Sequence, residues 1–318
     1  MIAGVPKTWF KIALMYRGST LPHTWRRVLF TTLWAVAVTF FWQSMELSRF
    51  SLTLAPFSVV GVAISIFLGF RNNTSYDRFW EGRKLWGRMV NVSRTWARQT
   101  LTMIQAPPDS SGPDKERARE LAVTLVHRQI AYVQALRMHL RDADWNTWRQ
   151  LLRYLPEDEA LSLEHESNRP AAITHRTGEL LVEAWHKGWL HPMHLPTLED
   201  SLTEITGVQG ACERIKATPV PWAYTVLTHR LVFIYCVTLP FGIEETVGVL
   251  TPLVVALVSY AFYGLDAIGD EIEEPFGLDP NDLPLNYLSR MIEVNLRQRI
   301  GGDEEIPPMI GPHDGVLD

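Results

Sequence analysis

Cysteine is scarce in this chain of 318 residues, and its scarcity excludes disulfide-rich and zinc-finger folds. Cys212 and Cys236 are the only two cysteines, and neither lies in a C-x-x-C pair. The glycine-rich nucleotide loops, the H-E-x-x-H zinc motif and the G-x-S-x-G nucleophile motif are missing as well. The sequence therefore predicts a protein that is not an enzyme, requires no cofactor and does not bind nucleic acid.

Charge is missing from long stretches, although the mean hydropathy of -0.02 is that of an ordinary soluble protein. Charge-free runs of 18, 21 and 20 residues cover 28–45, 50–70 and 246–265. A weaker window, 231–243, extends upstream through Arg230 to Pro219. A helix needs about 20 apolar residues to cross the hydrocarbon of a bilayer. The windows therefore predict four membrane helices arranged as two hairpins.

Basic residues flank the first hairpin and set its orientation. Residues 1–27 carry five basic and no acidic side chains, and residues 71–100 carry seven basic against two acidic ones. Both flanks are expected in the cytoplasm, with a short external loop around 43–49. The predicted parts are an N-terminal interfacial segment, a first membrane hairpin, a helical cytosolic region, a second membrane hairpin and an acidic cytosolic tail (residues 1–27, 28–70, 71–218, 219–265 and 266–318).

The middle of the chain has helical periodicity and no alternating pattern long enough for a sheet. Helices are predicted over 78–103, 116–140 and 198–216. Turn-rich breaks are predicted at 107–113 and 156–169. The fold class expected from these patterns is all-α.

An apolar stripe follows the second membrane window. Val62, Ile66 and Phe70 recur every fourth residue, so they share one face of a helix. Copies of this helix around an axis would stack these side chains into apolar rings that gate by dewetting. The alternative is that the stripe faces lipid or a neighbouring helix. Spacing alone favours the alternative.

Three longer motifs resemble the bestrophin family in its bacterial branch. They are IFLGF at residues 66–70 with YDRFWEGRKLWG at 76–87, and EIEEPFGLDPNDLPL at 271–285. Together with LPF at 239–241, they occur in the family's order. The resemblance implies a homopentameric ion channel in the bilayer of the bacterial inner membrane, with both termini cytoplasmic. Each subunit would supply four membrane helices to one axial pore that conducts monovalent ions passively.

The resemblance also assigns roles to single residues. It maps the family's apolar neck onto Val62, Ile66 and Phe70, which is the stripe found from spacing. A second constriction on the cytosolic side maps onto Met193.

An acidic cluster after the last membrane window invites a comparison with the calcium clasp of animal bestrophins. The resemblance aligns Asp279 and Asp282 with carboxylates of that clasp, with Glu271 and Glu274 where it has amides. Oxygen ligands suit Ca²⁺ or another divalent cation. Because Pro280 interrupts the loop, the sequence favours a different interpretation, an acidic helix terminus that supports the subunit interface.

Ion selectivity is open to two interpretations. The family's best-known activity is anion conduction, and Arg71, Asn72 and Asn73 beyond the neck favour anions as vestibule residues. Residues 266–318 carry 13 acidic and 3 basic side chains, which would concentrate cations in a vestibule. The resemblance therefore implies a chloride or anion channel with an apolar gate. Its alternatives are a sodium or potassium channel of the same fold, or a membrane-anchored scaffold or sensor with a cytosolic partner.

Overall fold

The computed structural model describes residues 8–16, 18–44, 53–302, 304–313 and 315–318, and these residues are almost entirely helical. The β-type pairings among them are two isolated bridges, Ile104 with Leu190 and His313 with Val316. The all-α expectation is thus confirmed for the described chain. The helices, with the short 3-10 turns labelled η, are α1 (Trp9–Ala13), α2 (Leu21–Ser44), α3 (Leu54–Met103), α4 (Gly112–Leu140), α5 (Trp145–Trp148), η2 (Arg149–Arg153), α6 (Glu157–Ser162), η3 (Leu163–His165), α7 (Arg169–His186), α8 (Leu195–Ala217), α9 (Trp222–Val247), η4 (Gly248–Leu250), α10 (Thr251–Glu273) and α11 (Leu285–Ile300).

The chain forms two compact units. The apolar unit comprises the described parts of residues 2–80 and 218–275, and the polar unit comprises residues 81–217 and 276–318. The expected boundaries at 70/71 and 265/266, between membrane and cytosolic segments, stay a prediction. Both α3 and α10 run unbroken through these positions, because their helical pattern does not stop where the charge-free windows stop.

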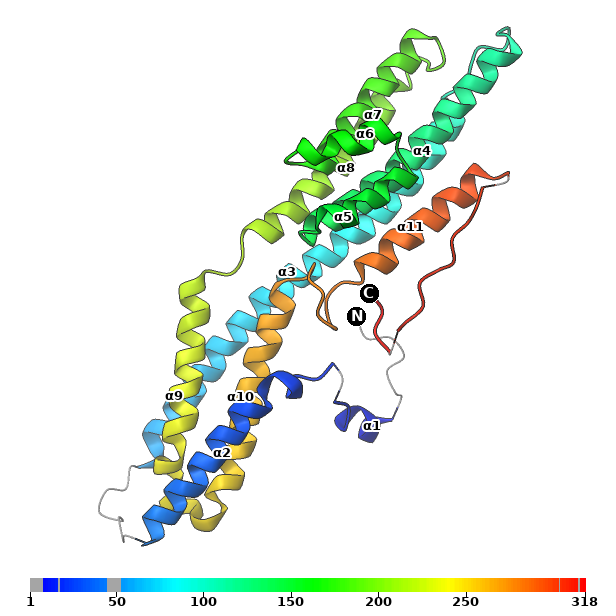
Figure 1. The fold of residues 1–318 in the computed structure, drawn as a ribbon. Helices are drawn as coiled ribbons and strands as arrows, with labels where there is room; N and C mark the ends of the chain where they lie inside the picture. Colours follow the sequence, from blue (N-terminus) through cyan, green and yellow to red (C-terminus); the bar gives the residue numbers. More distant parts are fainter. Residues whose placement is uncertain (1–7, 17, 45–52, 303, 314) are drawn as a thin grey trace. The chain divides into compact units, whose positions relative to one another are not determined.

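The apolar unit is a bundle of α2, α9, α10 and the first half of α3, and α2, α9 and α10 run alongside one another (Figure 1). Its core joins Ala35 of α2, Leu68 of α3, Cys236 of α9 and Val255 of α10, each with no exposed surface. Large apolar side chains such as Phe30, Leu33 and Phe40 of α2 stay exposed. An apolar exterior around an apolar core is typical of a bundle in lipid.

Two stretches of the described chain are long and apolar enough to cross a membrane, Leu54–Met103 and Trp222–Glu273. The second stretch contains both α9 and α10, which pack against each other. This finding agrees with a membrane location, while the number of four spanning helices stays a prediction. The expected external loop around 43–49 falls largely on residues outside the described ranges.

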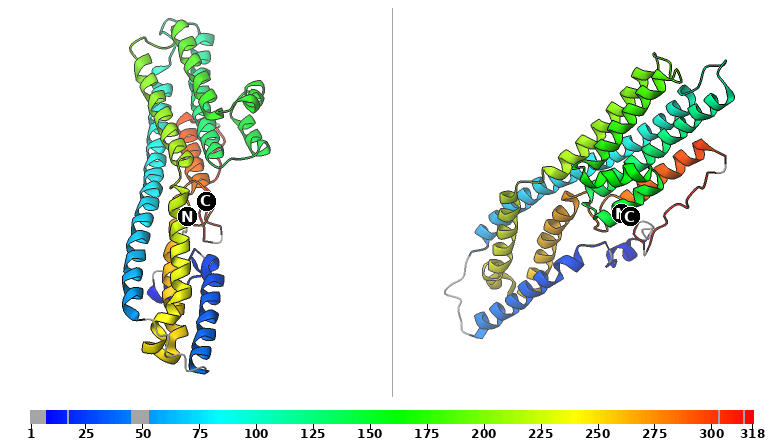
Figure 2. Two further views of the ribbon diagram at one scale, coloured as in Figure 1. Left: turned by 90° about the vertical axis from the view of Figure 1, so that its left-hand side faces the viewer. Right: turned by 45° about the horizontal axis from the view of Figure 1, so that its top comes forward.

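The polar unit is organised around α4, which packs against α7, α8 and α11 (Figure 2). The helix begins at Gly112, within the last residues of the predicted break at 107–113, and the Ser111 hydroxyl caps it by accepting a hydrogen bond from the Asp114 N–H at 3.3 Å. The indole of Trp96 in α3 donates to the Leu125 carbonyl of α4 at 3.0 Å. The three helices predicted in this region are confirmed as parts of α3, α4 and α8.

The break predicted over 156–169 is wrong, because α6 and η3 occupy most of it. Three acidic residues fill the first turn of α6, where the helix dipole favours negative charge. One of them, Glu159, receives both terminal nitrogens of buried Arg128 at 2.7 Å each. An ion pair with α4 therefore stabilises α6, although the composition of this segment is typical of a loop.

Candidate functional site

The apolar stripe lies on the free face of α3 in the apolar unit. Val62, Ile66 and Phe70 are 61%, 53% and 62% exposed, whereas Ile64 and Leu68 on the other face are buried in the core. The bundle therefore covers only one side of this helix. An exposed apolar face of this length requires lipid or another protein surface to cover it. Its role as a pore neck stays a prediction.

Arg71, one residue after the stripe, is fully buried within the single chain. Its role as an ion-vestibule residue stays a prediction. Its Nη1 donates to Asp266 Oδ1 at 2.8 Å, and its Nη2 bonds Asp270 and lies 3.8 Å from Glu273. All three carboxylates belong to α10. Arg71 lies seven residues after Ile64, so two helical turns place it on the packed face of α3.

The arginine is the centre of a charged cluster that sequence reasoning missed. On the far side of Asp266, Oδ2 receives His229 Nδ1 of α9 at 2.7 Å and lies 3.9 Å from Arg27 Nη1 of α2. Four helices of the apolar unit therefore meet at one nearly buried carboxylate. The Arg71 cluster, as we define it, consists of Arg27, Arg71, His229, Asp266, Asp270 and Glu273.

A signal for this cluster is present in the sequence. Asp266, Asp270 and Glu273 are spaced by four and three residues, which places them on one face of α10. Ionisable side chains at the end of an apolar helix are costly unless they pair with one another. The spacing could have predicted a carboxylate stripe, but not the arginine that meets it.

Among the described residues, His229, Asp266 and Asp270 bring one ligand atom each within 4.8 Å of one another. This spacing would suit a metal ion. The guanidinium of Arg71 already occupies both carboxylates, however, and a divalent cation would meet its positive charge. The arrangement therefore serves as an ion-pair network between helices.

The predicted metal residues divide between the two units. Asp282 is nearly buried, and its Oδ2 accepts the Asp279 N–H at 2.8 Å while its own N–H donates to the Asp279 carbonyl at 3.0 Å. These bonds close a turn in the polar unit. Glu271 and the exposed Glu274 belong to the apolar unit, at and just beyond the end of α10. The cation site that these four carboxylates would form stays a prediction, and so does the interpretation that the sequence favours, an acidic helix terminus at the subunit interface.

The remaining candidates differ in accessibility. Asn72 Nδ2 donates to the Leu265 carbonyl of α10 at 3.0 Å, and its Oδ1 lies against the position where a Cβ on Gly269 would stand. Asn72 therefore contributes to helix packing. Asn73 on α3 and Met193, in the turn between α7 and α8, are exposed, so both stay available for the roles predicted from the sequence.

Comparison with known proteins identifies relatives over nearly the whole chain. The family model described as Bacterial/Fungal Bestrophin protein matches residues 1–298. The chain is 37% identical over 313 residues to a voltage-dependent anion channel-forming protein of Escherichia coli K12, covering 98% of both chains. It is 39% identical over 303 residues to one of the same description from Ralstonia nicotianae, covering 93% of this chain and 94% of the other.

A solved structure gives the same relationship. The crystal structure of a bacterial bestrophin homolog from Klebsiella pneumoniae matches with a TM-score of 0.78 and 34% identity. The match covers 86% of this chain and 97% of that one. The resemblance expected from the motifs at 66–87 and 271–285 is therefore confirmed, and a protein other than an enzyme fits these relatives.

Proposed function

Because this chain belongs to the bacterial and fungal bestrophin family, we propose that it forms a homopentameric membrane channel that conducts monovalent anions passively. Five copies of α3 surround the pore, and Val62, Ile66 and Phe70 form its apolar neck. The observation that carries this proposal is that only one face of α3 packs into the bundle: Ile64 and Leu68 are buried, whereas the stripe is exposed. Relatives described as anion channel-forming proteins support the choice of ion.

The face of α3 that carries the stripe becomes polar directly beyond Phe70, as a pore that opens into a wetted mouth requires. Asn73 and Asp77 lie seven residues after Ile66 and Phe70, and both are exposed. The face thus passes from apolar to polar within two turns. A neck that opens into a wetted mouth has this order, and an apolar constriction excludes ions by dewetting until it widens.

In the proposed topology the end of the apolar stretch near Arg71 faces the cytoplasm of a bacterial inner membrane. The excess of basic residues over 71–100 supports this orientation. Met193 forms the second constriction, in the polar unit on the same side.

The proposal is tested by reversal potentials of the purified protein in a planar bilayer under a KCl gradient. Under a tenfold gradient, the reversal potential of an ideal anion channel shifts by about 59 mV, to the chloride equilibrium potential. Absence of current from a pentameric protein and from its neck variants would oppose the channel and favour the scaffold. The sign of the reversal potential distinguishes an anion channel from a cation channel.

The neck is tested by substituting Ile66. Ile66→Ala removes three carbon atoms from each of five facing side chains, so we expect a wider, more easily wetted neck and a larger single-channel conductance. Ile64→Val, on the buried face, is the matched control and leaves conductance unchanged. Equal conductance of Ile66→Ala and the wild type in assembled pentamers would remove Ile66 from the gate.

A cation channel is the second candidate, and a specific observation favours it. Arg71 is neutralised inside the bundle, so it adds no free positive charge to the mouth, whereas Asp77 is exposed on the stripe face. A ring of five carboxylates there would attract cations. If the reversal potential follows K⁺, Asp77→Asn should move it toward zero.

A further inference from the structure

The polar unit contains a cavity of about 340 Å³ lined by α4, η2, α11 and the segment that follows α11. Three arginines from three different elements line it, one each from α4, η2 and α11. We call it the arginine pocket. Those arginines are Arg137, Arg153 and Arg290, and Asn286, His313 and Asp318 are among its other polar residues.

The positive charge in this pocket is only partly compensated. Arg137 directs its Nε to Gln134 Oε1 at 3.1 Å and its Nη1 to Asn286 Oδ1, which are neutral acceptors. Burial, followed by the neighbouring Arg141 guanidinium, lowers the pKa of Arg137. Within the part of the chain that the structure describes, neither Arg137 nor Arg153 forms an ion pair.

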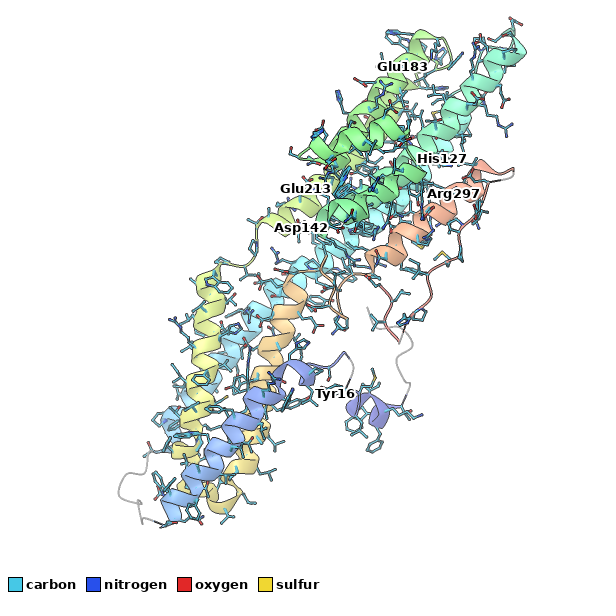
Figure 3. All side chains as sticks on the ribbon, in the orientation of Figure 1. Tyr16, His127, Asp142, Glu183, Glu213 and Arg297 are labelled. Carbon is cyan, nitrogen blue, oxygen red and sulfur yellow. The ribbon has the colours of Figure 1, made fainter. Side chains whose placement is uncertain are left out.

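The third arginine shares its counter-charge with a neighbour. Arg290 Nη1 lies 3.1 Å from Glu293 Oε2, but Glu293 Oε1 also receives Arg297 at 3.2 Å and the Tyr154 hydroxyl at 2.9 Å. Figure 3 labels Arg297 on α11. Arg297 has a second carboxylate partner in Glu304, whereas Arg290 has Glu293 alone among the described residues. Among the residues that line the pocket, three arginines face one acidic side chain, Asp318, so the lining retains net positive charge.

Asp318 lines the pocket and is itself held by two donors, Asn286, which also lines it, and Arg141, which does not. The Asp318 carboxylate accepts Arg141 Nη2 and Asn286 Nδ2, each at 2.6 Å. Its main-chain oxygen accepts the Tyr287 N–H at 2.8 Å, which fixes it beside α11. These short charge-assisted bonds are typical of oxyanion binding.

We propose that the arginine pocket binds a small tetrahedral oxyanion, phosphate or the phosphate group of a metabolite. One planar carboxylate is satisfied by a single guanidinium fork, whereas three arginines on three elements suit the terminal oxygens of a phosphate. The cavity is large enough for such a group with a small organic substituent. The site lies in the polar unit and does not depend on the identity of the permeant ion.

Calorimetric titration of the purified full chain in detergent, at constant ionic strength, tests the proposal. The probes are inorganic phosphate, glycerol 3-phosphate, succinate and chloride. We expect saturable binding of phosphate that chloride and succinate do not match. Tighter binding of glycerol 3-phosphate would identify a phosphorylated metabolite as the source, and equal binding would identify free phosphate. No saturable phosphate binding, or equal heats from all four anions, would overturn the proposal.

Two neighbouring arginines of η2 provide a matched pair of variants. Arg153 lines the pocket and Arg149 does not, and both are exposed. Arg153→Gln should weaken phosphate binding about tenfold or more, because it removes a charged donor, while Arg149→Gln leaves the affinity unchanged. Arg153→Lys should retain part of the affinity. Equal loss in the Arg153→Gln and Arg149→Gln variants would show a general charge effect and refute the site.

A variant that should strengthen phosphate binding separates an effect on binding from an effect on folding. Asp318→Asn removes the negative charge at the edge of the pocket, so phosphate should bind several-fold more tightly. A purely structural role of Asp318 predicts the same or weaker binding. Unchanged or weaker phosphate binding in this variant would therefore count against the pocket.

Discussion

Removing the charge of Arg71 should destabilise the apolar unit strongly. The substitution Arg71→Met keeps an unbranched side chain at this position of α3 but removes the guanidinium. Arg71 is fully buried, and the side chain of its partner Asp266 is only 2% exposed. The variant therefore leaves a buried carboxylate that has lost its buried guanidinium partner.

The remaining contacts of Asp266 set the size of the effect. Deleting one partner of a buried ion pair costs about 3–5 kcal/mol. Asp266 keeps His229 at 2.7 Å and the half-exposed Arg27 at 3.9 Å, which compensate part of the loss. We expect the lower end of the range, about 3 kcal/mol, which is roughly a 100-fold change in the folding equilibrium.

The assay is thermal unfolding in detergent, followed as the loss of the folded species on size exclusion. The matched control is Arg88→Met, because Arg88 pairs with Glu204 at 2.7 Å while 62% exposed. An exposed pair of this kind is worth about 0–1 kcal/mol. The double variant Arg71→Met/Asp266→Asn should be less destabilised than the two single losses added together. If Arg71→Met melts at the same temperature as Arg88→Met, the buried pair does not hold α3 to α10.

Two further predictions concern packing and thiol chemistry. A Cβ on Gly61 would stand 2.7 Å from the Tyr235 hydroxyl, so Gly61→Ala should lower the free energy of unfolding by about 1–3 kcal/mol. The control Gly69→Ala meets open space and should be neutral or stabilising. Equal melting temperatures of the two variants would refute the close approach. Burial raises the pKa of the Cys212 thiol to about 12, so maleimide should not modify it at pH 8 in the folded protein, as mass spectrometry can check; rapid labelling would contradict its burial. Because the unfolded thiol titrates near pH 9 and the folded one near 12, this group stabilises the fold below pH 9, and its contribution is lost as pH rises from 9 to 12.

The helices and the family could be predicted from the sequence because both depend on local patterns. The helical period over 78–103 and 116–140 survives in α3 and α4, and the break at 107–113 has the residues that end and begin helices. The segment 156–169 was misjudged because α6 depends on the long-range pair of Glu159 with Arg128. A pattern confined to fourteen residues holds no information about that partner.

Arg71 shows why the candidate site was predicted only in part. Its neighbours in sequence, Phe70 and Asn73, are exposed, and an interpretation by adjacency assigns Arg71 to the same surface. A helix turns about 100° per residue, so adjacency is a poor guide to the face. Counting from Ile64 and Leu68, which are buried, places Arg71 on the packed side. Counting helical turns from buried core positions therefore predicts the face of a charged residue better than its sequence neighbours do.

The burial of Arg71 also bears on ion selection in the proposed channel. The Arg71 cluster combines two arginines with three carboxylates, so its formal charge is -1 with neutral His229 and zero when His229 is protonated. A cluster that nearly neutralises itself produces little field beyond its own diameter. In the proposed channel, selectivity would then depend on charges that stay exposed on the stripe face, such as Asp77, which lies seven residues beyond Phe70. Asp77→Asn should therefore change the reversal potential, whereas a variant of the cluster should change stability first.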